Sequence, residues 1–335
     1  MLQSNNRGKL QNMDFSDRQA ELDAFKELNL SVVASNFGYR IVKTKSTRHS
    51  VLMESSNDKI IVGKNGKHYV YCSVFNDQSN GTIIDFAQQS IEPGASLGRV
   101  RQLLRPFLNV SFFSTVQKQH EGHFASSIRQ SNTDFLAVAT RYSQFEPIVH
   151  ANNYLCKKRF IPLPLLRSDR IKGRVALCGK TQMVIFPHWG IDEEGDGRPL
   201  TGYELKGCGV SLFSKAGRKG LWISAGYEHD NAIVFAESGV DALSYMTLNS
   251  SSKNLRVASV SGQISSIQLK LISCAIARMP LKSSVIAAFD SDRSGDKLTE
   301  KLKGEFENCG RSDLKFVDHR PEIRSQDWNY VLSVS

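Results

Sequence analysis

The alternation of hydrophobic and polar positions changes about two thirds of the way along the chain. From Ala232 onward, short apolar runs alternate with helical patterns. The predicted strands are 232–236, 255–260, 284–289 and 314–317, and the predicted helices start at Val240 and cover 264–277 and 296–306. This alternation is typical of βαβ units, in which parallel strands form one sheet flanked by helices. The last third is therefore predicted to be an α/β domain with a Rossmann-like parallel sheet.

The chain before this point has a different pattern. A short helix is predicted over 28–37, followed by strands at 39–42, 50–53, 60–62 and 68–74 and by helices after Asn80-Gly81-Thr82 and around 97–107. Residues 115–134 are rich in Ser, Gln and His, as in linkers. The predicted organisation is a flexible tail (1–22), an α+β domain (23–114), a linker (115–134), an α+β region (135–228) and the α/β domain (229–335).

Length and composition narrow the class of protein. With 335 residues, the chain exceeds a single ordinary core, since domains run to roughly 100–200 residues. Hydrophobic residues make up 40% and charged residues 23%, as in folded globular proteins. No stretch approaches the roughly 18 apolar residues of a membrane span, so we expect a cytoplasmic protein without membrane contact. The six cysteines form no C-x-x-C pair, which argues against disulfides and a cysteine-rich zinc site.

Positive charge is concentrated in one segment. The formal net charge is +10, and residues 151–180 hold eight basic residues against one acid, Asp169. Such a segment favours phosphate backbones through counterion release, although charge alone does not separate DNA, RNA and an anionic membrane. The candidates for contacting a nucleic-acid backbone or a triphosphate, some of which we expect to be solvated surface, are Lys157, Lys158, Arg159, Arg167, Arg170, Lys172 and Arg174.

Two acidic motifs follow the first and third strands of the α/β domain. They are Glu237-Ser238-Gly239-Val240-Asp241 and Asp290-Ser291-Asp292-Arg293-Ser294-Gly295. Parallel strands place their carboxyl ends at one sheet edge, so both motifs should share one crevice. Gathered carboxylates repel one another unless a cation lies between them, and hard oxygen ligands suit Mg²⁺ or Mn²⁺. A calcium loop is excluded, because its twelfth position would be Lys301 and its fifth Ser294.

These motifs resemble the toprim family, which has a Glu after the first strand and D-x-D after the third. Ser261-Gly262 and Gln326-Asp327-Trp328-Asn329 are similar to further elements of primase toprims, with Gln326 in place of a usual Lys. The resemblance implies phosphoryl or nucleotidyl transfer with Glu237, Asp290 and Asp292 as the catalytic, metal-binding centre and Asp241 as a further metal-site residue. It assigns supporting roles to Gly239, Gly262, Gly295, Asp327 and Asn329.

The resemblance extends upstream. Tyr154-Leu155 through Arg159-Phe160-Ile161 is similar to the Y-L-x-x-R-x-I segment of primase cores, and residues 80–86 resemble the primase zinc-binding-type module. That module offers only His49, His68 and Cys72 as ligands, too few for a tetrahedral site, so no zinc is expected. The whole resembles toprim-containing, primase-like proteins of plasmids and integrating elements. This implies a bacterial cytoplasmic protein acting on a single-stranded DNA template or other nucleic acid with nucleoside triphosphates, in company with a helicase or relaxase.

Other functions stay open at this point. A toprim nuclease would use the same carboxylates to activate water, and a DNA-binding accessory protein would carry them without catalysis. A topoisomerase needs an additional domain for its tyrosine, for which the chain has little room. Residues 173–181 miss the phosphate-loop spacing because position 174 is Arg. Trp189 and Trp222 are candidates for base stacking, although isolated aromatic residues more often belong to a core.

Overall fold

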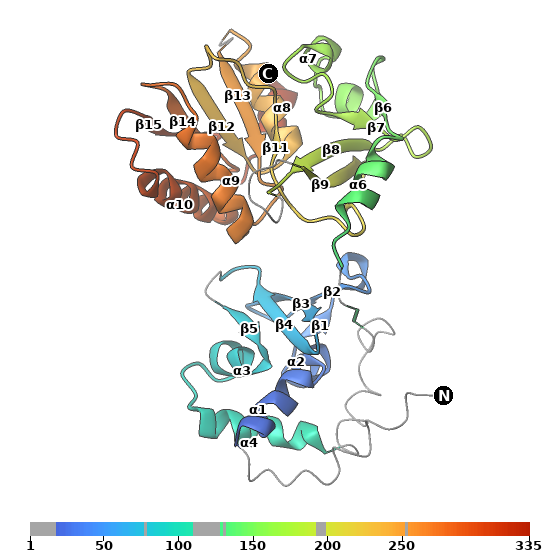
Figure 1. The fold of residues 1–335 in the computed structure, drawn as a ribbon, viewed down its shortest axis with the longest axis vertical. Coiled ribbons are helices and arrows are strands. Elements are labelled where there is room, and N and C mark those ends of the chain that lie inside the picture. Colours follow the sequence, from blue (N-terminus) through green and yellow to red (C-terminus); the bar gives the residue numbers. More distant parts are fainter. Residues whose placement is uncertain (1–17, 77–78, 110–127, 130–131, 192–198, 252–253) are drawn as a thin grey trace. The chain divides into compact units, whose positions relative to one another are not determined.

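The computed structural model describes residues 18–76, 79–109, 128–129, 132–191, 199–251 and 254–335. It divides into two compact units, Met1–Ser131 and Asn132–Ser335, which we describe separately (Figure 1). Most of the predicted tail (1–22) and linker (115–134) lies outside the described residues, but a helix already begins at Arg18, where the polar pattern predicts tail. No described helix has the length and apolar character needed to cross a membrane.

The first unit is built on an antiparallel sheet with the strand order β1-β2-β3-β4-β5. Alternate side chains of β2 and β3 are buried against the helices, and Thr82 and Asp85 form a capping box that starts α3. This arrangement confirms the α+β prediction for this part. The elements are α1 (Arg18–Glu27), α2 (Leu30–Asn36), β1 (Arg40–Ile41), η2 (Lys43–Lys45), β2 (Ser50–Glu54), β3 (Lys59–Asn65), β4 (His68–Ser73), β5 (Asn80–Thr82), α3 (Ile83–Phe86), η3 (Ala87–Ile91) and α4 (Leu97–Leu108).

The second unit begins with another antiparallel sheet, ordered β10-β9-β8-β7-β6. Its central strand β8 is buried over most of its length. Strands β9 and β10 form a hairpin at one edge of this sheet. The elements are α6 (Phe135–Tyr142), β6 (Glu146–Pro147), η5 (Asn153–Lys158), α7 (Leu163–Arg167), β7 (Ala176–Leu177), β8 (Val184–Trp189), β9 (Leu200–Gly207) and β10 (Val210–Phe213).

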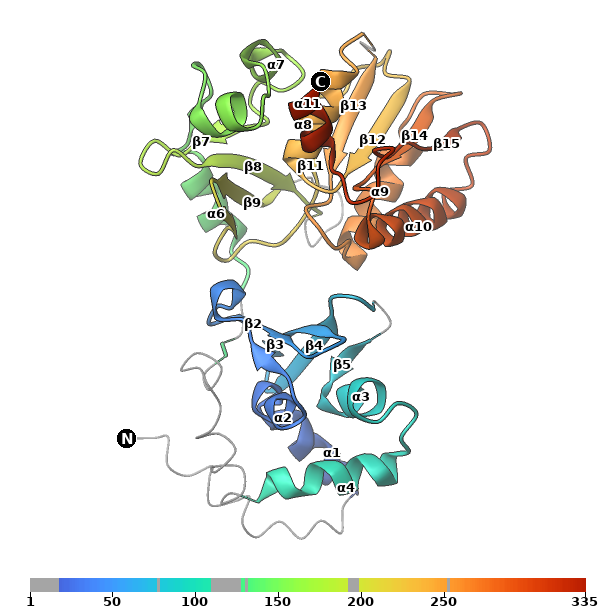
Figure 2. The same ribbon diagram turned by 180° about the vertical axis from the view of Figure 1, so that it is seen from behind.

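The predicted α/β domain is present in the same unit. Its sheet has the order β11-β13-β12-β14-β15 and is parallel except for the edge strand β11, which the sequence did not predict. Helices α8 and α11 cover one face, and α9 and α10 cover the other (Figures 1 and 2). The elements are β11 (Trp222–Ile223), β12 (Ala232–Ala236), α8 (Gly239–Leu248), β13 (Leu255–Ser259), α9 (Ser266–Ala277), β14 (Ser284–Ala288), α10 (Arg293–Asn308), β15 (Lys315–Asp318) and α11 (Trp328–Val334).

One hydrophobic core joins the two sheets of the second unit. Phe186 of β8 packs edge-on against Trp222, with ring centroids 5.6 Å apart, in a cluster that includes Val234 and Val240 of the α/β domain. Trp222 is completely buried, so it belongs to the core. Gly239, at the start of α8, lies where a Cβ would meet the Phe186 ring. The absence of a side chain at Gly239 therefore allows the first acidic motif to approach β8 closely.

Candidate active site

The register of the parallel sheet brings the two acidic motifs to one edge. Strands β12 and β14 are neighbours, and Ala236 is paired with Ala288 at their carboxyl ends. Glu237 directly follows β12, and Asp290 follows β14 after one further residue. Parallel neighbouring strands with this register place the loops that follow them side by side. The predicted acids Glu237, Asp241, Asp290 and Asp292 are thus collected at the end of the sheet where the parallel strands finish. We call this end the acidic edge.

Each motif is held at the start of a helix. The Ser238 hydroxyl accepts a hydrogen bond from the Asp241 amide at 3.3 Å, which caps α8, and donates one to the Asp241 carboxylate at 2.5 Å. Asp292 caps α10 by accepting from the Gly295 amide at 2.8 Å. Both helix N-termini favour negative charge nearby. A Cβ on Gly295 would collide with the main-chain oxygen of Asp290, so this position requires glycine.

Two carboxylates at this edge, those of Glu237 and Asp290, combine burial with an incomplete set of hydrogen bonds among the described residues. Burial, followed by the charges of Asp292 and Asp241, raises the pKa of Glu237 to about 7. Burial and then the charges of Asp241 and Glu237 also raise the pKa of Asp290. One oxygen of Glu237 and one of Asp290 are buried and have no hydrogen-bond partner among the described residues. Unpaired, buried negative charge is costly, and a cation at this edge would relieve the cost.

The chemistry of these groups can be compared with the needs of a metal ion. In the part of the chain that the structure describes, no three His, Cys, Asp or Glu side chains form a ready set of metal ligands. Mg²⁺, however, commonly uses one or two carboxylates and completes its shell with water and substrate phosphate oxygens. The unpartnered oxygens of Glu237 and Asp290 are hard donors of this type. The residues therefore fit Mg²⁺ or Mn²⁺ held partly by substrate, rather than a closed protein cage.

The element around Asn329 joins the acidic edge to the basic segment. The Asn329 side-chain amide donates to the Arg159 main-chain oxygen at 2.8 Å, and the Arg159 guanidinium donates to the Asn329 side-chain oxygen at 2.9 Å. Asp327 caps α11 by accepting from the Tyr330 amide at 2.6 Å. A polar cavity of about 110 Å³ lies here. Its lining residues are Tyr154, Arg159, Lys206, Ser238, Val240, Asp241, Asp327 and Asn329.

Gln326 helps to hold the loop with Asp290 and Asp292 in place through a main-chain hydrogen bond. Its carbonyl oxygen accepts from the Ser291 amide at 2.9 Å, and the Ser325 amide donates to the Ser291 oxygen at 2.6 Å. These bonds tie the loop that carries Asp290 and Asp292 to the loop before α11. Because the main chain makes both bonds, the departure from the usual Lys at this position leaves them intact.

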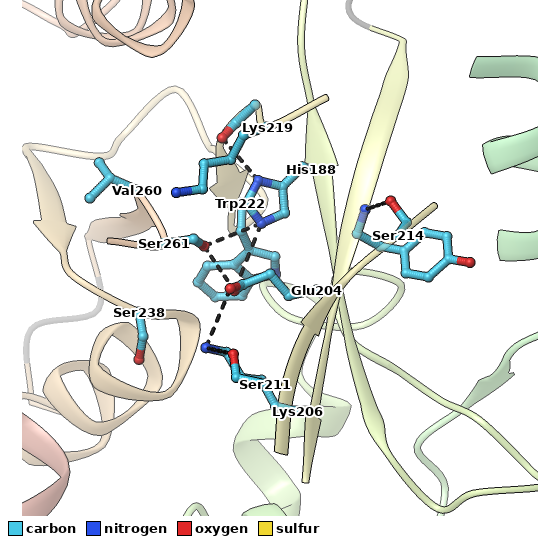
Figure 3. A network of polar contacts seen from close by, with 12 residues as sticks. His188, Glu204, Lys206, Ser211, Ser214, Lys219, Trp222, Ser238, Val260 and Ser261 are labelled. Carbon is cyan, nitrogen blue, oxygen red and sulfur yellow. Dashed lines mark hydrogen bonds and ion pairs between the residues drawn. The ribbon is translucent and has the colours of Figure 1, made fainter. Parts of the chain in front are cut away.

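A group of polar residues next to the acidic edge was not predicted from the sequence (Figure 3). Glu204 of β9 accepts a hydrogen bond from the Ser261 hydroxyl at 2.8 Å and lies 3.3 Å from the Lys206 ammonium nitrogen. Lys206 and Lys219 act on Glu237 through their charges, which oppose the effect of burial on its pKa. The sequence signal for Glu204 and Lys206 is the charged pair in Tyr203-Glu204-Leu205-Lys206, in a strand whose residues 201–204 are buried.

Ser261-Gly262, by contrast, was singled out from the sequence. Ser261 has a left-handed backbone, with φ at 57°, and its hydroxyl lies 3.2 Å from Nε2 of the buried His188. The Gly262 amide donates to the main-chain oxygen of Glu237 at 3.1 Å. This turn therefore connects the network around Glu204 with the backbone that carries Glu237.

The seven predicted basic residues fall into three groups. Lys157, Lys158, Arg167 and Lys172 are exposed, and Arg159 and Arg174 are half-buried. Arg170 is buried and bonds both oxygens of Asp230, at 2.7 and 2.9 Å. Its prediction as a nucleic-acid contact is corrected here, because its guanidinium is already taken up by a buried ion pair. The positive charge of the segment alone could not reveal this pairing.

Comparison with known proteins identifies the class of the C-terminal domain. Residues 234–332 match the family model described as Toprim-like. This match covers both acidic motifs and confirms the toprim resemblance for this part of the chain. Comparison with curated proteins finds no match.

Among solved structures, the chain is similar to the primase fragment of the bacteriophage T7 primase-helicase protein, at 16% identity and a TM-score of 0.36, covering 61% of this chain and 77% of that one. It is also similar to a chain in a T7 lagging-strand DNA polymerase complex with primase domains bound to an RNA/DNA hybrid and dTTP. That match has 16% identity and a TM-score of 0.31, and it covers 48% of this chain and 76% of the other. Both TM-scores are too low to establish a shared overall fold.

Proposed function

We propose that the protein is a primase-like, Mg²⁺-dependent nucleotidyltransferase that synthesises short primers on single-stranded template. The observation that carries the proposal is that Glu237 and Asp290, at the carboxyl ends of adjacent parallel strands, each have a buried oxygen with no partner among the described residues. The Toprim-like match over residues 234–332 supports the same class of chemistry. The basic segment and the lysines beside Glu237 provide positive charge for phosphates.

The proposed roles follow from the positions of the side chains. Asp290 and Asp292 hold the divalent cation. When bound, this cation would offset negative charge on the reacting phosphate. Glu237, at the same end of the sheet, accepts the proton of the primer 3′-hydroxyl as a general base. The 3′-oxygen then bonds to the α-phosphorus of the incoming nucleotide, the bond from that phosphorus to its bridging oxygen breaks, and pyrophosphate leaves.

The remaining residues position these groups and the substrates. Asp241, bonded to Ser238, supports the acidic centre from the first turn of α8. Lys206 and Lys219 face the acidic edge and are suited to contact the triphosphate. The exposed members of the basic segment (Lys157, Lys158, Arg167 and Lys172) are proposed to hold the template backbone. A helicase or relaxase partner and a role in the replication or transfer of a plasmid or mobile element belong to this proposal as well.

Primer synthesis is tested with single-stranded DNA, labelled nucleoside triphosphates and Mg²⁺. We expect labelled oligonucleotides and released pyrophosphate from the wild type, and none from Glu237→Gln. Glu300→Gln, an exposed position on α10, serves as the matched control and should retain synthesis. Mg²⁺-dependent nicking of DNA without triphosphates would overturn the proposal in favour of a nuclease. A folded wild type that binds DNA but forms neither product would favour the accessory protein.

Metal binding is tested separately by calorimetry. Asp290→Asn/Asp292→Asn should lose the Mg²⁺ binding that the wild type shows. Asparagine at 292 retains the oxygen that caps α10, so this variant is expected to fold. Unchanged Mg²⁺ binding by the folded double variant would contradict the assignment of both residues as ligands.

A further inference from the structure

A second cavity, of about 380 Å³, lies along the edge strand β11 and helix α9. It combines an apolar wall with three guanidinium groups. Its lining residues are Arg174, Trp189, Leu221, Ile223, Arg256, Leu271, Cys274, Ala275 and Arg278. The volume is within the range of about 300–1,000 Å³ that is usual for small-molecule sites. None of these residues lines the polar cavity next to Asp241, so the two cavities are distinct.

Two of the three arginines have no acidic partner among the described residues. The guanidinium of Arg174 lies over the Trp189 ring, 4.6 Å from its centroid. Among the described residues, neither Arg174 nor Arg278 is paired with a carboxylate. Arg256 differs, because it lies 3.1 Å from Asp230. Burial lowers the pKa of Arg174, as expected for a cation that is withdrawn from water without a counterion.

Arg278 makes no side-chain bond to the carbonyl oxygens at the end of α9 in the described part of the chain, although its position after the helix would suit that role. It follows α9, where a cation often bonds the last carbonyl oxygens of a helix. Here the Arg311 guanidinium does so, donating to the oxygens of Ala277 at 2.7 Å and of Met279 at 3.1 Å. Arg311 is itself held by Asp313. The exposed Arg278 is therefore left at the rim of the cavity to meet an anion from outside the chain.

Two arginines of the cavity lie at the opposite end of the sheet from the acidic edge. Arg256 is near the amino end of β13, and Arg278 follows the carboxyl end of α9, whereas Glu237 and Asp290 follow the carboxyl ends of their strands. A five-residue strand spans roughly 16 Å at about 3.3 Å per residue, which separates the two ends. Leu221 and Ile223 lie beside the carboxyl end of β13, but β13 stands between β11 and the strands that precede Glu237 and Asp290, and neither carboxylate lines the cavity.

We propose that this cavity is a second nucleotide site, which takes the base of a nucleotide against its apolar wall and the phosphates at Arg174 and Arg278. The wall of Leu221, Ile223, Leu271 and Ala275 suits a flat base. Guanidinium groups are the preferred partners of phosphate oxygens, to which they donate in pairs. The ligand is either a free nucleotide or one nucleotide of a single strand, since both present a base beside a phosphate. The site is independent of the proposed synthesis of primers.

Cys274 gives a direct readout, because it is a free thiol that lines the cavity. The full-length protein is alkylated with iodoacetamide in a metal chelator, and each cysteine is followed by mass spectrometry. ATP should slow the alkylation of Cys274 at least about fivefold and leave the exposed Cys208 unchanged, as expected for near-saturated occupancy. Oligothymidylate in place of ATP distinguishes the sources: protection by ATP alone assigns a free nucleotide, and protection by the oligonucleotide alone assigns a strand. Protection by neither overturns the proposal.

Variants separate the two halves of the site. Arg278→Ala removes an exposed side chain and should weaken the binding of the protecting ligand about tenfold, the usual effect of losing one charged hydrogen bond. Lys303→Ala, an exposed position on α10, is the matched control and should bind like the wild type. Ala275→Phe fills the wall and should abolish protection. Equal affinity of Arg278→Ala and Lys303→Ala would overturn the proposal, and equal protection by inorganic tripolyphosphate would show an anion site without base recognition.

Discussion

Buried carboxylates in the second unit differ in how completely their oxygens are hydrogen-bonded or paired with positive charge. Asp230 is fully buried, but Arg170, Arg256 and the Tyr227 amide satisfy its oxygens. Burial opposes ionisation there, yet these partners lower the pKa of Asp230 overall. At the acidic edge, Glu237 and Asp290 have raised pKa values, and one oxygen of each has no hydrogen-bond partner among the described residues. The chain can pair a buried acid fully, so the lack of partners at the edge is a feature of the site, which is open to a ligand.

The largest difference should appear in catalysis. Glu237→Gln removes the proposed general base, and we expect primer synthesis to fall about 100- to 10,000-fold. Burial outweighs the opposing charges of Lys206 and Lys219 at Glu237, and one of its oxygens has no hydrogen-bond partner among the described residues, so the neutral side chain should not lower the stability of the fold. Product formation and urea denaturation are measured on the same preparation. A variant that is strongly destabilised would contradict the contrast with Asp230.

Asp230 should show the reverse pattern, a large loss of stability. Asp230→Ala leaves Arg170 buried without its partner, and breaking such a pair costs about 3–5 kcal/mol. Urea denaturation at neutral pH measures the change, with the exposed Asp169→Ala as control. The lowered pKa of Asp230 means that its contribution is present above the ordinary value and is lost as the pH falls below it. A loss under about 1 kcal/mol would show that the ion pair does not stabilise the fold.

Glu204 should behave like Asp230, although it lies beside the acidic edge. Burial alone would raise its pKa, but His188, Lys206 and Ser261 together lower it to about 2 from 4.5. Its charge therefore stabilises the fold above pH 4.5, and this contribution is lost as the pH falls toward 2. We expect Glu204→Gln to be roughly 2–3 kcal/mol less stable than the wild type at pH 6, and the two to converge in acid. Parallel stability curves, compared with the exposed Glu228→Gln, would contradict this.

The smallest effect concerns the exposed charges. Lys157→Ala/Lys158→Ala should reduce the salt dependence of single-strand binding, because fewer phosphates are neutralised by the protein. The slope of log K against log salt should become shallower by up to about 0.7 for each phosphate that the variant no longer neutralises. Arg167→Ala/Lys172→Ala tests the other exposed pair in the same way. The slope is measured by fluorescence anisotropy of a labelled oligonucleotide. A slope that stays at the wild-type value in both double variants would remove this segment from the proposed template path.

The elements of the toprim-like domain could be predicted because their signals are local. Strand 232–236 matches β12, and both acidic motifs begin at the carboxyl ends of strands. The parallel pairing then follows from the handedness of βαβ connections. The edge strand β11 was missed, since Trp222 and Ile223 form too short a run to indicate a strand, and its pairing with β13 joins residues far apart in sequence.

Long-range pairings within the site were also beyond sequence reasoning. Arg159, Arg170 and Arg174 carry the same charge and cannot be told apart by it in the sequence. In the structure Arg159 bonds Asn329, Arg170 forms a buried ion pair with Asp230, and Arg174 lies over the Trp189 ring. The contact that each arginine makes depends on a partner that is distant in sequence and is brought near only by the fold. Glu204 and Lys206 were missed for the same reason, because their relation to Glu237 arises only when the antiparallel sheet packs against the toprim-like domain.

The hydrogen bonds between Arg159 and Asn329 also bear on the order in which parts of the protein form during synthesis. These residues are 170 positions apart in the chain. At about 5–20 residues per second, a ribosome needs roughly 10–35 seconds to pass from one to the other. During this interval Arg159 and its neighbours have been synthesised, but Asn329, whose side chain bonds Arg159, has not. The polar cavity next to the acidic centre is therefore assembled late in biosynthesis, after the strands that support it.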